Sequence, residues 1–165
     1  MLRNKKGSID SILVMIVTIP FIVYLMIFFI YVIMHFSAQT RVTTETYKLA
    51  KVIARSGKIT TGALENYTNG LNTTGPLAGD FEYTIFSKEV KDDGDDGDWL
   101  EVVKGESDKS VGSYDATVEG GSLVKIYVTQ KGTVSKLGAA LNALFNVDGT
   151  GVKIQDSVEM VVQKW

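Results

Sequence analysis

The sequence predicts an α+β protein in which a long N-terminal helix is followed by a small head with a mainly antiparallel sheet and one or two short helices. Two observations predict this class. Residues 12–36 carry no formal charge when His35 is counted as neutral, and residues 81–162 break into short alternating segments separated by glycine and charge. Helical and strand patterns that are segregated along a chain are typical of α+β folds.

The chain is expected to divide into four parts. Residues 1–7 form a basic cytoplasmic leader, and residues 8–36 form a hydrophobic helix that spans a membrane or forms the core of a filament. Residues 37–57 continue this helix as an amphipathic segment, and residues 58–165 form an extracellular α+β head. With 165 residues in total, the head has room for one small core.

The hydrophobic run predicts a retained membrane helix. At 1.5 Å per residue its 25 residues span roughly 37 Å, more than the ~30 Å of the bilayer core. A cleavable secretory signal has a hydrophobic region of only about 7–15 residues. Arg3, Lys5 and Lys6 precede the run, whereas Arg41 is the only fixed positive charge within ten residues after it. The positive-inside rule therefore places the N-terminus in the cytoplasm and residues from Ser37 onward outside.

Two residues within this region are unusual for a simple anchor. Pro20 lacks an N–H and clashes with the carbonyl of Ile16, so the helix is expected to kink or melt locally there. Asp10 places a carboxylate at the inner edge of the apolar run. It either lies in the headgroup layer near Lys5 and Lys6, with little consequence, or it serves in assembly.

Beyond the membrane, apolar residues continue at helical spacing. Val42, Leu49, Val52 and Ile53 mark one face, while Glu45, Lys48, Lys51 and Arg55 lie mainly on the others, which is an amphipathic pattern. Gly57 is placed to end the helix. A simple anchor has no need of this second half.

These features together resemble type IV pilin-like proteins, and most closely the TadE-like pseudopilins of tight-adherence systems. Lys5-Lys6-Gly7 corresponds to the basic-glycine junction of that family, Asp10 to its acidic residue and Pro20 to its proline. The segment 47–57, YKLAKVIARSG, is similar to the alanine-rich, arginine-containing helix end of the family. The resemblance covers about a third of the chain.

The resemblance implies a structural subunit of a pilus-like filament or a secretion or adherence apparatus. Its apolar helix leaves the membrane and packs against the helices of identical or related pilin subunits at the cell surface. A buried carboxylate then needs a partner, which in pilins is implied to be the N-terminal amine of a neighbouring subunit. If cleavage after Gly7 does not occur, Lys5 or Lys6 of a neighbour would pair with Asp10 instead.

The alternative function is that of a bitopic membrane protein whose extracytoplasmic head binds a partner, such as an accessory component of a secretion or conjugation apparatus. A filament subunit must leave the lipid, whereas a bitopic protein stays there. Asp10, Pro20 and the amphipathic continuation favour the filament subunit.

The head is expected to contain seven elements. They are a helix over 58–71, strands over 81–85, 99–103, 114–118 and 122–130, a helix over 133–146, and a strand pair or one bent strand over 152–162. The turn Glu119-Gly120-Gly121-Ser122 precedes the clearest strand, whose residues alternate with the period of two that a half-buried strand shows.

The composition offers little for catalysis or metal binding. There is no cysteine and only one histidine, so no histidine-based triad, no cysteine metal site and no metal site with several histidines can be built within one chain. Asp92, Asp93, Asp95, Asp96 and Asp98 form an acidic run that calcium would favour. However, Gly94 and Val103 occupy positions where an EF-hand needs ligands, so a solvated loop without metal is expected. We predict no enzyme, no cofactor and, because the head is acidic, no nucleic-acid partner.

Overall fold

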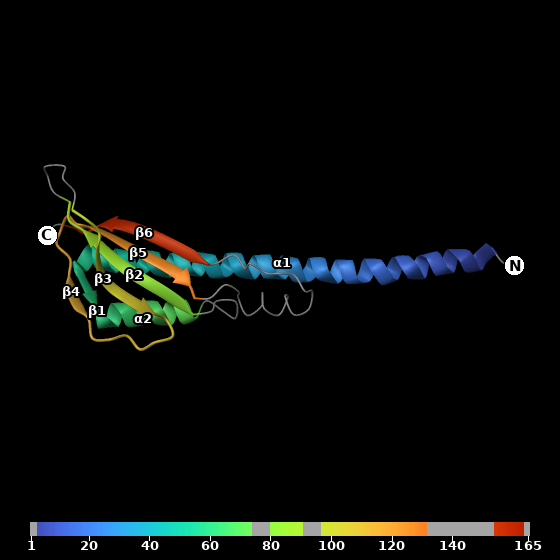
Figure 1. The fold of residues 1–165 in the computed structure, drawn as a ribbon, viewed down its shortest axis with the longest axis horizontal. Helices are drawn as coiled ribbons and strands as arrows, with labels where there is room; N and C mark the ends of the chain where they lie inside the picture. Colours follow the sequence, from blue (N-terminus) through green and yellow to red (C-terminus); the bar gives the residue numbers. More distant parts are fainter. Residues whose placement is uncertain (1–2, 74–79, 91–96, 132–153, 164–165) are drawn as a thin grey trace. The chain divides into compact units, whose positions relative to one another are not determined.

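The computed structural model describes residues 3–73, 80–90, 97–131 and 154–163, with side chains from Ile12 onward except that of Leu13. In chain order the elements are α1 (Arg3–Ser56), β1 (Lys58–Thr60), α2 (Thr61–Asn72), β2 (Phe81–Lys88), β3 (Leu100–Glu106), β4 (Asp115–Thr117), β5 (Leu123–Gln130) and β6 (Gln155–Val161) (Figure 1). A long apolar helix followed by a small antiparallel head confirms the predicted α+β class. The chain forms two compact units, Met1–His35 and Phe36–Trp165.

Helix α1 is continuous over 54 residues with Pro20 inside it. The helix is therefore not locally melted at Pro20, and the kink, which was the other form of the expectation, stays a prediction. A proline removes one N–H donor, which leaves the carbonyl of Ile16 without its usual partner. The remaining hydrogen bonds on either side form cooperatively and preserve the helix through this single gap.

Gly57 ends α1 as the sequence predicts. Its φ of 64° lies in the left-handed region, where a side chain would be strained. Its N–H donates to the carbonyl of Ile53 at 2.8 Å, which satisfies one of the carbonyls left over at the helix end. The same turn brings the chain close to Val118, whose N–H donates to the Gly57 carbonyl at 2.8 Å.

The main sheet has four strands in the order β3-β2-β5-β6, and every neighbouring pair is antiparallel. As expected, β5 is a long strand, and it lies in the interior of the sheet. Residues 152–153 lie outside the described residues, and within the rest of the stretch predicted over 152–162 as a strand pair or one bent strand the structure has the single strand β6. Its N–H and carbonyl groups pair with β5 from Leu123↔Val161 to Thr129↔Gln155.

The helix predicted over 58–71 begins three residues later than expected. Residues Lys58–Thr60 instead form β1, which pairs with β4 in a separate two-stranded sheet. Ile59 is fully buried there, and Thr60 caps α2 by accepting a hydrogen bond from the N–H of Ala63 at 3.3 Å. A threonine cap favours a helix start at the following residue, so the strand and the cap together determine the boundary.

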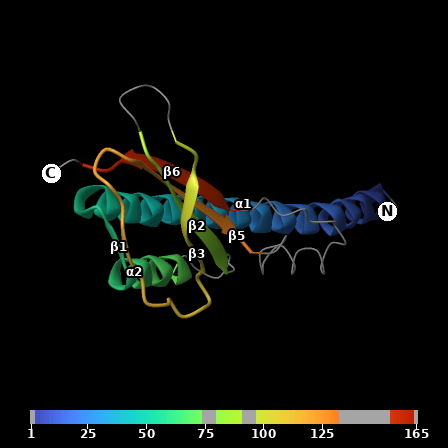
Figure 2. The ribbon, with the colours of Figure 1, turned by 60° about the vertical axis from the view of Figure 1, so that its left-hand side comes forward.

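One core joins the C-terminal part of α1, α2 and one face of the main sheet. Figures 1 and 2 show both helices along the same side of the sheet. The face of α1 that enters the core differs from the predicted one at two positions. Val52 is half-exposed, and Thr46 is fully buried in its place. The largest fully buried side chains are Phe81, Ile53, Ile59, Leu64, Leu71, Ile85, Ile126 and Ile154.

A close contact between β2 and β3 depends on Gly105. Tyr83 and Gly105 are paired across the two strands. A Cβ atom added at Gly105 would collide with the hydroxyl and ring of Tyr83, so the ring occupies the space that any larger residue would need. Packing an aromatic ring over a cross-strand glycine stabilises a position that is otherwise weak in a strand.

Candidate functional site

The residues expected to act in assembly all belong to α1. Lys5, Lys6, Gly7 and Asp10 lie in its first turns, where the structure describes the backbone as helical. Pro20 lies further along, with its ring exposed. The helical backbone at all five positions keeps them on a single rigid element.

The apolar stretch that follows Asp10 is exposed along most of its length. Ile16, Val17 and Ile33 are each 65–67 % exposed, and none of the most apolar segment of α1 is buried within the chain. By length and composition this helix could cross a membrane. Apolar side chains in such numbers need either lipid or other protein around them.

Aromatic rings mark the C-terminal end of the apolar stretch. The rings of Tyr31 and His35 stack with their centroids 6.2 Å apart. The two residues are four positions apart, so they lie on one face of the helix. Rings with a polar edge are favoured at a membrane–water boundary, which agrees with the end of the span expected near Phe36.

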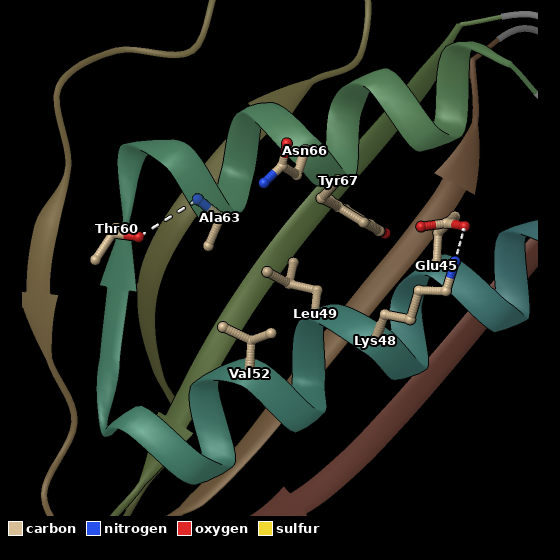
Figure 3. A pocket seen from close by; sticks show the side chains of 8 residues that line it. All are labelled: Glu45, Lys48, Leu49, Val52, Thr60, Ala63, Asn66 and Tyr67. Atoms are coloured by element: carbon tan, nitrogen blue, oxygen red, sulfur yellow. Dashed lines mark hydrogen bonds and ion pairs between the residues drawn. The ribbon is translucent and has the colours of Figure 1, made fainter.

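A groove runs between α1 and α2 on the surface of the head (Figure 3). It encloses about 350 Å³ and is lined by Glu45, Lys48, Leu49, Val52, Thr60, Ala63, Asn66 and Tyr67. The floor is apolar, while a 2.7 Å ion pair between the Lys48 ammonium and the Glu45 carboxylate lies at one end. An exposed pair of this kind contributes only about 0–1 kcal/mol. The groove has the size and polarity to accept a side chain of another molecule.

A buried hydroxyl pair lies next to this groove, in the core between the two helices. The Thr46 hydroxyl donates to the Val42 carbonyl at 2.8 Å and lies 3.1 Å from the Tyr67 hydroxyl. Burial raises the pKa of Tyr67, although its hydrogen bond to Thr46 opposes the rise. Burial likewise raises the pKa of Tyr83, whose ring packs edge-to-face against that of Tyr67 at 5.3 Å. Both phenols therefore remain neutral well above physiological pH.

Arg41 connects α1 to the end of α2. Its Nη1 donates to the carbonyl of Thr73 at 2.6 Å, at the C-terminal cap of α2. A cation at this position satisfies a free carbonyl and interacts favourably with the helix dipole. The contact fixes the two helices against each other at the end opposite to β1.

The acidic run falls largely outside the described residues. Asp92, Asp93, Asp95 and Asp96 are not described, and Asp98 is exposed. Among the described residues there is no group of three or more histidine or acidic side chains that could hold a metal ion. The absence of metal predicted for the run remains a prediction. The helix expected over 133–146 also lies outside the described residues.

The sequence did not indicate the buried polar pair or the groove. Thr46 interrupts an apolar face, and threonine in an amphipathic helix is ordinarily assigned to the exposed side. The signal that was available is spacing, because Thr46 follows Val42 by four residues and precedes Ile53 by seven, which places all three on one helical face.

Comparisons with protein-family models, with curated protein sequences and with solved structures found no match to the chain.

Proposed function

We propose that the chain is a structural subunit, pilin-like or pseudopilin-like, of an extracellular filament or of a secretion or adherence apparatus. It assembles with copies of itself or related subunits through its N-terminal hydrophobic helix, after residence in the membrane with its N-terminus in the cytoplasm. Lys5, Lys6 and Gly7 form the basic-glycine junction, Asp10 pairs with a basic group of a neighbouring subunit, and Pro20 corresponds to the proline of the pilin-like family.

The observation that carries this proposal is the double character of one uninterrupted helix. Residues 12–36 expose apolar side chains, whereas Ala38, Val42, Leu49 and Ile53 on the same helix are 0–4 % exposed within the head core. Helix α1 continues from the apolar segment into the head core without a break, so no linker separates the two along the chain. A flexible linker would be sufficient for an anchor.

A bitopic membrane protein with a partner-binding head is the second candidate. The length and composition of α1 favour it equally, because they satisfy the requirements for a membrane span. The two candidates differ in the final surroundings of the apolar helix. These are other subunits for a filament subunit and lipid for a bitopic protein. A test must therefore measure assembly separately from insertion and folding.

The deciding experiment compares Asp10→Ala with Asp115→Ala in cells that produce the full chain. Asp115 is an exposed aspartate of β4, so it controls for loss of a carboxylate far from the helix bundle. Pairing of Asp10 with a neighbouring basic group is short-range and desolvated, so its loss is expected to reduce assembly about tenfold, which corresponds to roughly 1.4 kcal/mol. Polymer in sheared surface fractions is the measurement, and Asp115→Ala should leave it unchanged.

Three further measurements accompany it. Protease added to intact protoplasts should trim the head, and Pro20→Leu should impair assembly while insertion is retained. Mass spectrometry of the N-terminus decides whether the chain is cut after Gly7. Wild-type amounts of polymer from the Asp10→Ala strain would remove this carboxylate from the mechanism, and no polymer from any strain would leave the bitopic candidate.

A further inference from the structure

Two segments of the head match the acceptor sequence Asn-X-Thr for an N-linked sugar. They are Asn66-Tyr67-Thr68, inside α2, and Asn72-Thr73-Thr74, which begins at the last residue of α2. Such a match often arises by chance, so the surroundings of each asparagine decide whether a sugar fits there. These surroundings differ between the two asparagines in the folded head.

The side chain of Asn66 is open to solvent. Asn66 is exposed, and no hydrogen bond or ion pair with another described residue holds its amide. Its helical neighbours Leu64, Tyr67 and Thr68 are buried instead, so α2 turns Asn66 away from the core. Figure 3 shows Asn66 at the edge of the groove between α1 and α2. A sugar on its amide nitrogen can therefore extend over this groove.

The amide of Asn72 already has a partner. Its Nδ2 donates to the carbonyl of Ser107 at 2.8 Å. Ser107 is 2 % exposed, and both its N–H and its hydroxyl are bonded to the backbone of Phe81. A sugar on this nitrogen would have to fit beside a packed segment of the head. Of the two asparagines, Asn66 is the one whose amide the folded head leaves accessible.

The hydroxyl of the Asn66 sequence is covered once the head has folded. Thr68 is 5 % exposed, and its Oγ1 donates to the Glu65 carbonyl at 3.0 Å. A hydroxyl at this position defines the acceptor sequence, so a transferase has to reach it before α2 packs on the sheet. Synthesis provides this interval. The inner strand β5 begins at Leu123, 55 residues after Thr68, and making them takes roughly 3 to 11 seconds.

The groove beside Asn66 suits a sugar ring. It encloses about 350 Å³, which is within the range of small-ligand pockets. Val52 in its lining is half-exposed, and the C–H groups of a sugar can cover such an apolar surface. The ion pair of Lys48 and Glu45 at one end offers a donor and an acceptor to sugar hydroxyls. A sugar attached at Asn66 would thus cover apolar surface that is otherwise exposed.

We propose that Asn66 carries an N-linked sugar that covers the groove between α1 and α2. A separate transferase adds it to the exported chain, from a donor in which C1 of the sugar is bonded to a phosphate. A bond forms between the Asn66 amide nitrogen and C1, the bond between C1 and the phosphate oxygen breaks, and the phosphate leaves with the electron pair. The amide proton passes to a base of the transferase. The proposal rests on export of the head, which the filament and bitopic candidates share.

The test is mass spectrometry of the full chain purified from the cells that naturally produce it. After allowance for any cut at Gly7, the intact mass should exceed the mass of the sequence by one or more sugar residues. Digestion should place the added mass on the peptide that contains Asn66. Asn66→Gln should lose the added mass, whereas the matched control Asn72→Gln should keep it.

A second pair of variants separates the acceptor sequence from the fold. Thr68→Ser keeps a hydroxyl and should keep the sugar, whereas Thr68→Val has a similar shape and should lose it. Protease resistance of the head controls for folding in both variants.

Covering of the groove is measured by the reactivity of Lys48 toward an amine reagent. The reactivity should rise severalfold in Asn66→Gln, because the sugar no longer lies over the groove. Lys104, an exposed lysine of β3 that does not line the groove, is the internal control and should react equally in both chains. Unchanged reactivity of Lys48 would overturn the covering of the groove and leave the modification itself.

The remaining outcomes separate this proposal from the filament proposal. An unmodified Asn66 peptide, or a sugar on Asn72 in its place, would overturn the proposal. A modified chain without sheared polymer would support the sugar and reject the filament, whereas polymer of unmodified chains would do the reverse. An unmodified chain whose head is protected from protease on intact protoplasts would reject export and the sugar together.

Discussion

The two parts of α1 share one backbone geometry but bury their apolar side chains in different ways. In residues 12–36 apolar residues surround the helix and are exposed, whereas in residues 37–56 most of them lie on the side that enters the head core, with Tyr47 and Val52 as exposed exceptions. The first part has apolar surface that nothing within the described chain buries. The second is covered by α2 and the sheet. Helix formation alone therefore does not say where an apolar residue is buried, and the contrast between the two parts can be tested residue by residue.

The largest expected effect comes from the same substitution made in each part. Ile53→Ala removes a fully buried side chain and should lower the free energy of unfolding of the head by about 2–5 kcal/mol. Ile33→Ala removes a side chain that is 67 % exposed and should change the free energy of unfolding by no more than about 0.5 kcal/mol. Denaturant unfolding of the full chain in detergent micelles measures both. Equal losses of unfolding free energy in the two variants would show that the two parts of α1 do not differ in how they bury their apolar side chains.

Two glycines sharpen the comparison inside the head. Gly105→Ala forces a Cβ atom against the Tyr83 ring and should destabilise the head by about 1–3 kcal/mol. Gly62→Ala, in the first turn of α2, meets no atom within 4 Å and should stabilise it by up to about 1 kcal/mol. Thermal unfolding of the two variants beside the parent chain is the measurement. A destabilised Gly62→Ala variant would contradict the open space at that position.

The smallest effect is a pH dependence. The pKa of Tyr67 is raised above the ordinary value of about 10. Above that pH the folded state therefore holds a proton that the unfolded state loses, and stability falls as pH rises. Tyr67→Phe should cost about 0.5–1.5 kcal/mol at neutral pH through the lost contact with Thr46. It should also reduce the fall in stability above pH ~10. Unfolding at pH 8 and pH 11 tests this, and some slope should remain because the pKa of Tyr83 is also raised.

The sequence alone was sufficient to predict those elements whose residue pattern is local. The end of α1 at Gly57 and the strands β2 and β5 followed from glycine placement and from alternation. The pairing of β1 with β4 did not, because three residues carry too little periodicity and their partner lies more than 50 residues away. Val52 was misassigned for a related reason, since the position of α2 decides which side of α1 is covered.

The candidate site was only partly predictable. Exposure of the apolar helix follows from composition, and the basic residues of α1 were visible at helical spacing. The row of Glu101, Phe86, Lys125 and Glu159 on the outer face of the sheet was not visible, because only strand register joins these residues. Register is set by long-range pairing, which a single sequence does not reveal.

The last strand also determines when the head can close during synthesis. The Gln39 amide donates to the Gln155 carbonyl across 116 positions, and the Gln163 N–H donates to Ala54. At roughly 5–20 residues per second, about 6 to 23 seconds separate the appearance of Gln39 from that of Gln155. During this interval β2, β3 and β5 are completed before β6, so the sheet over the core side of α1 lacks only its last strand toward the end. The sheet edge at β5 stays unpaired until β6 joins it, and an unpaired edge favours aggregation of the nascent chain.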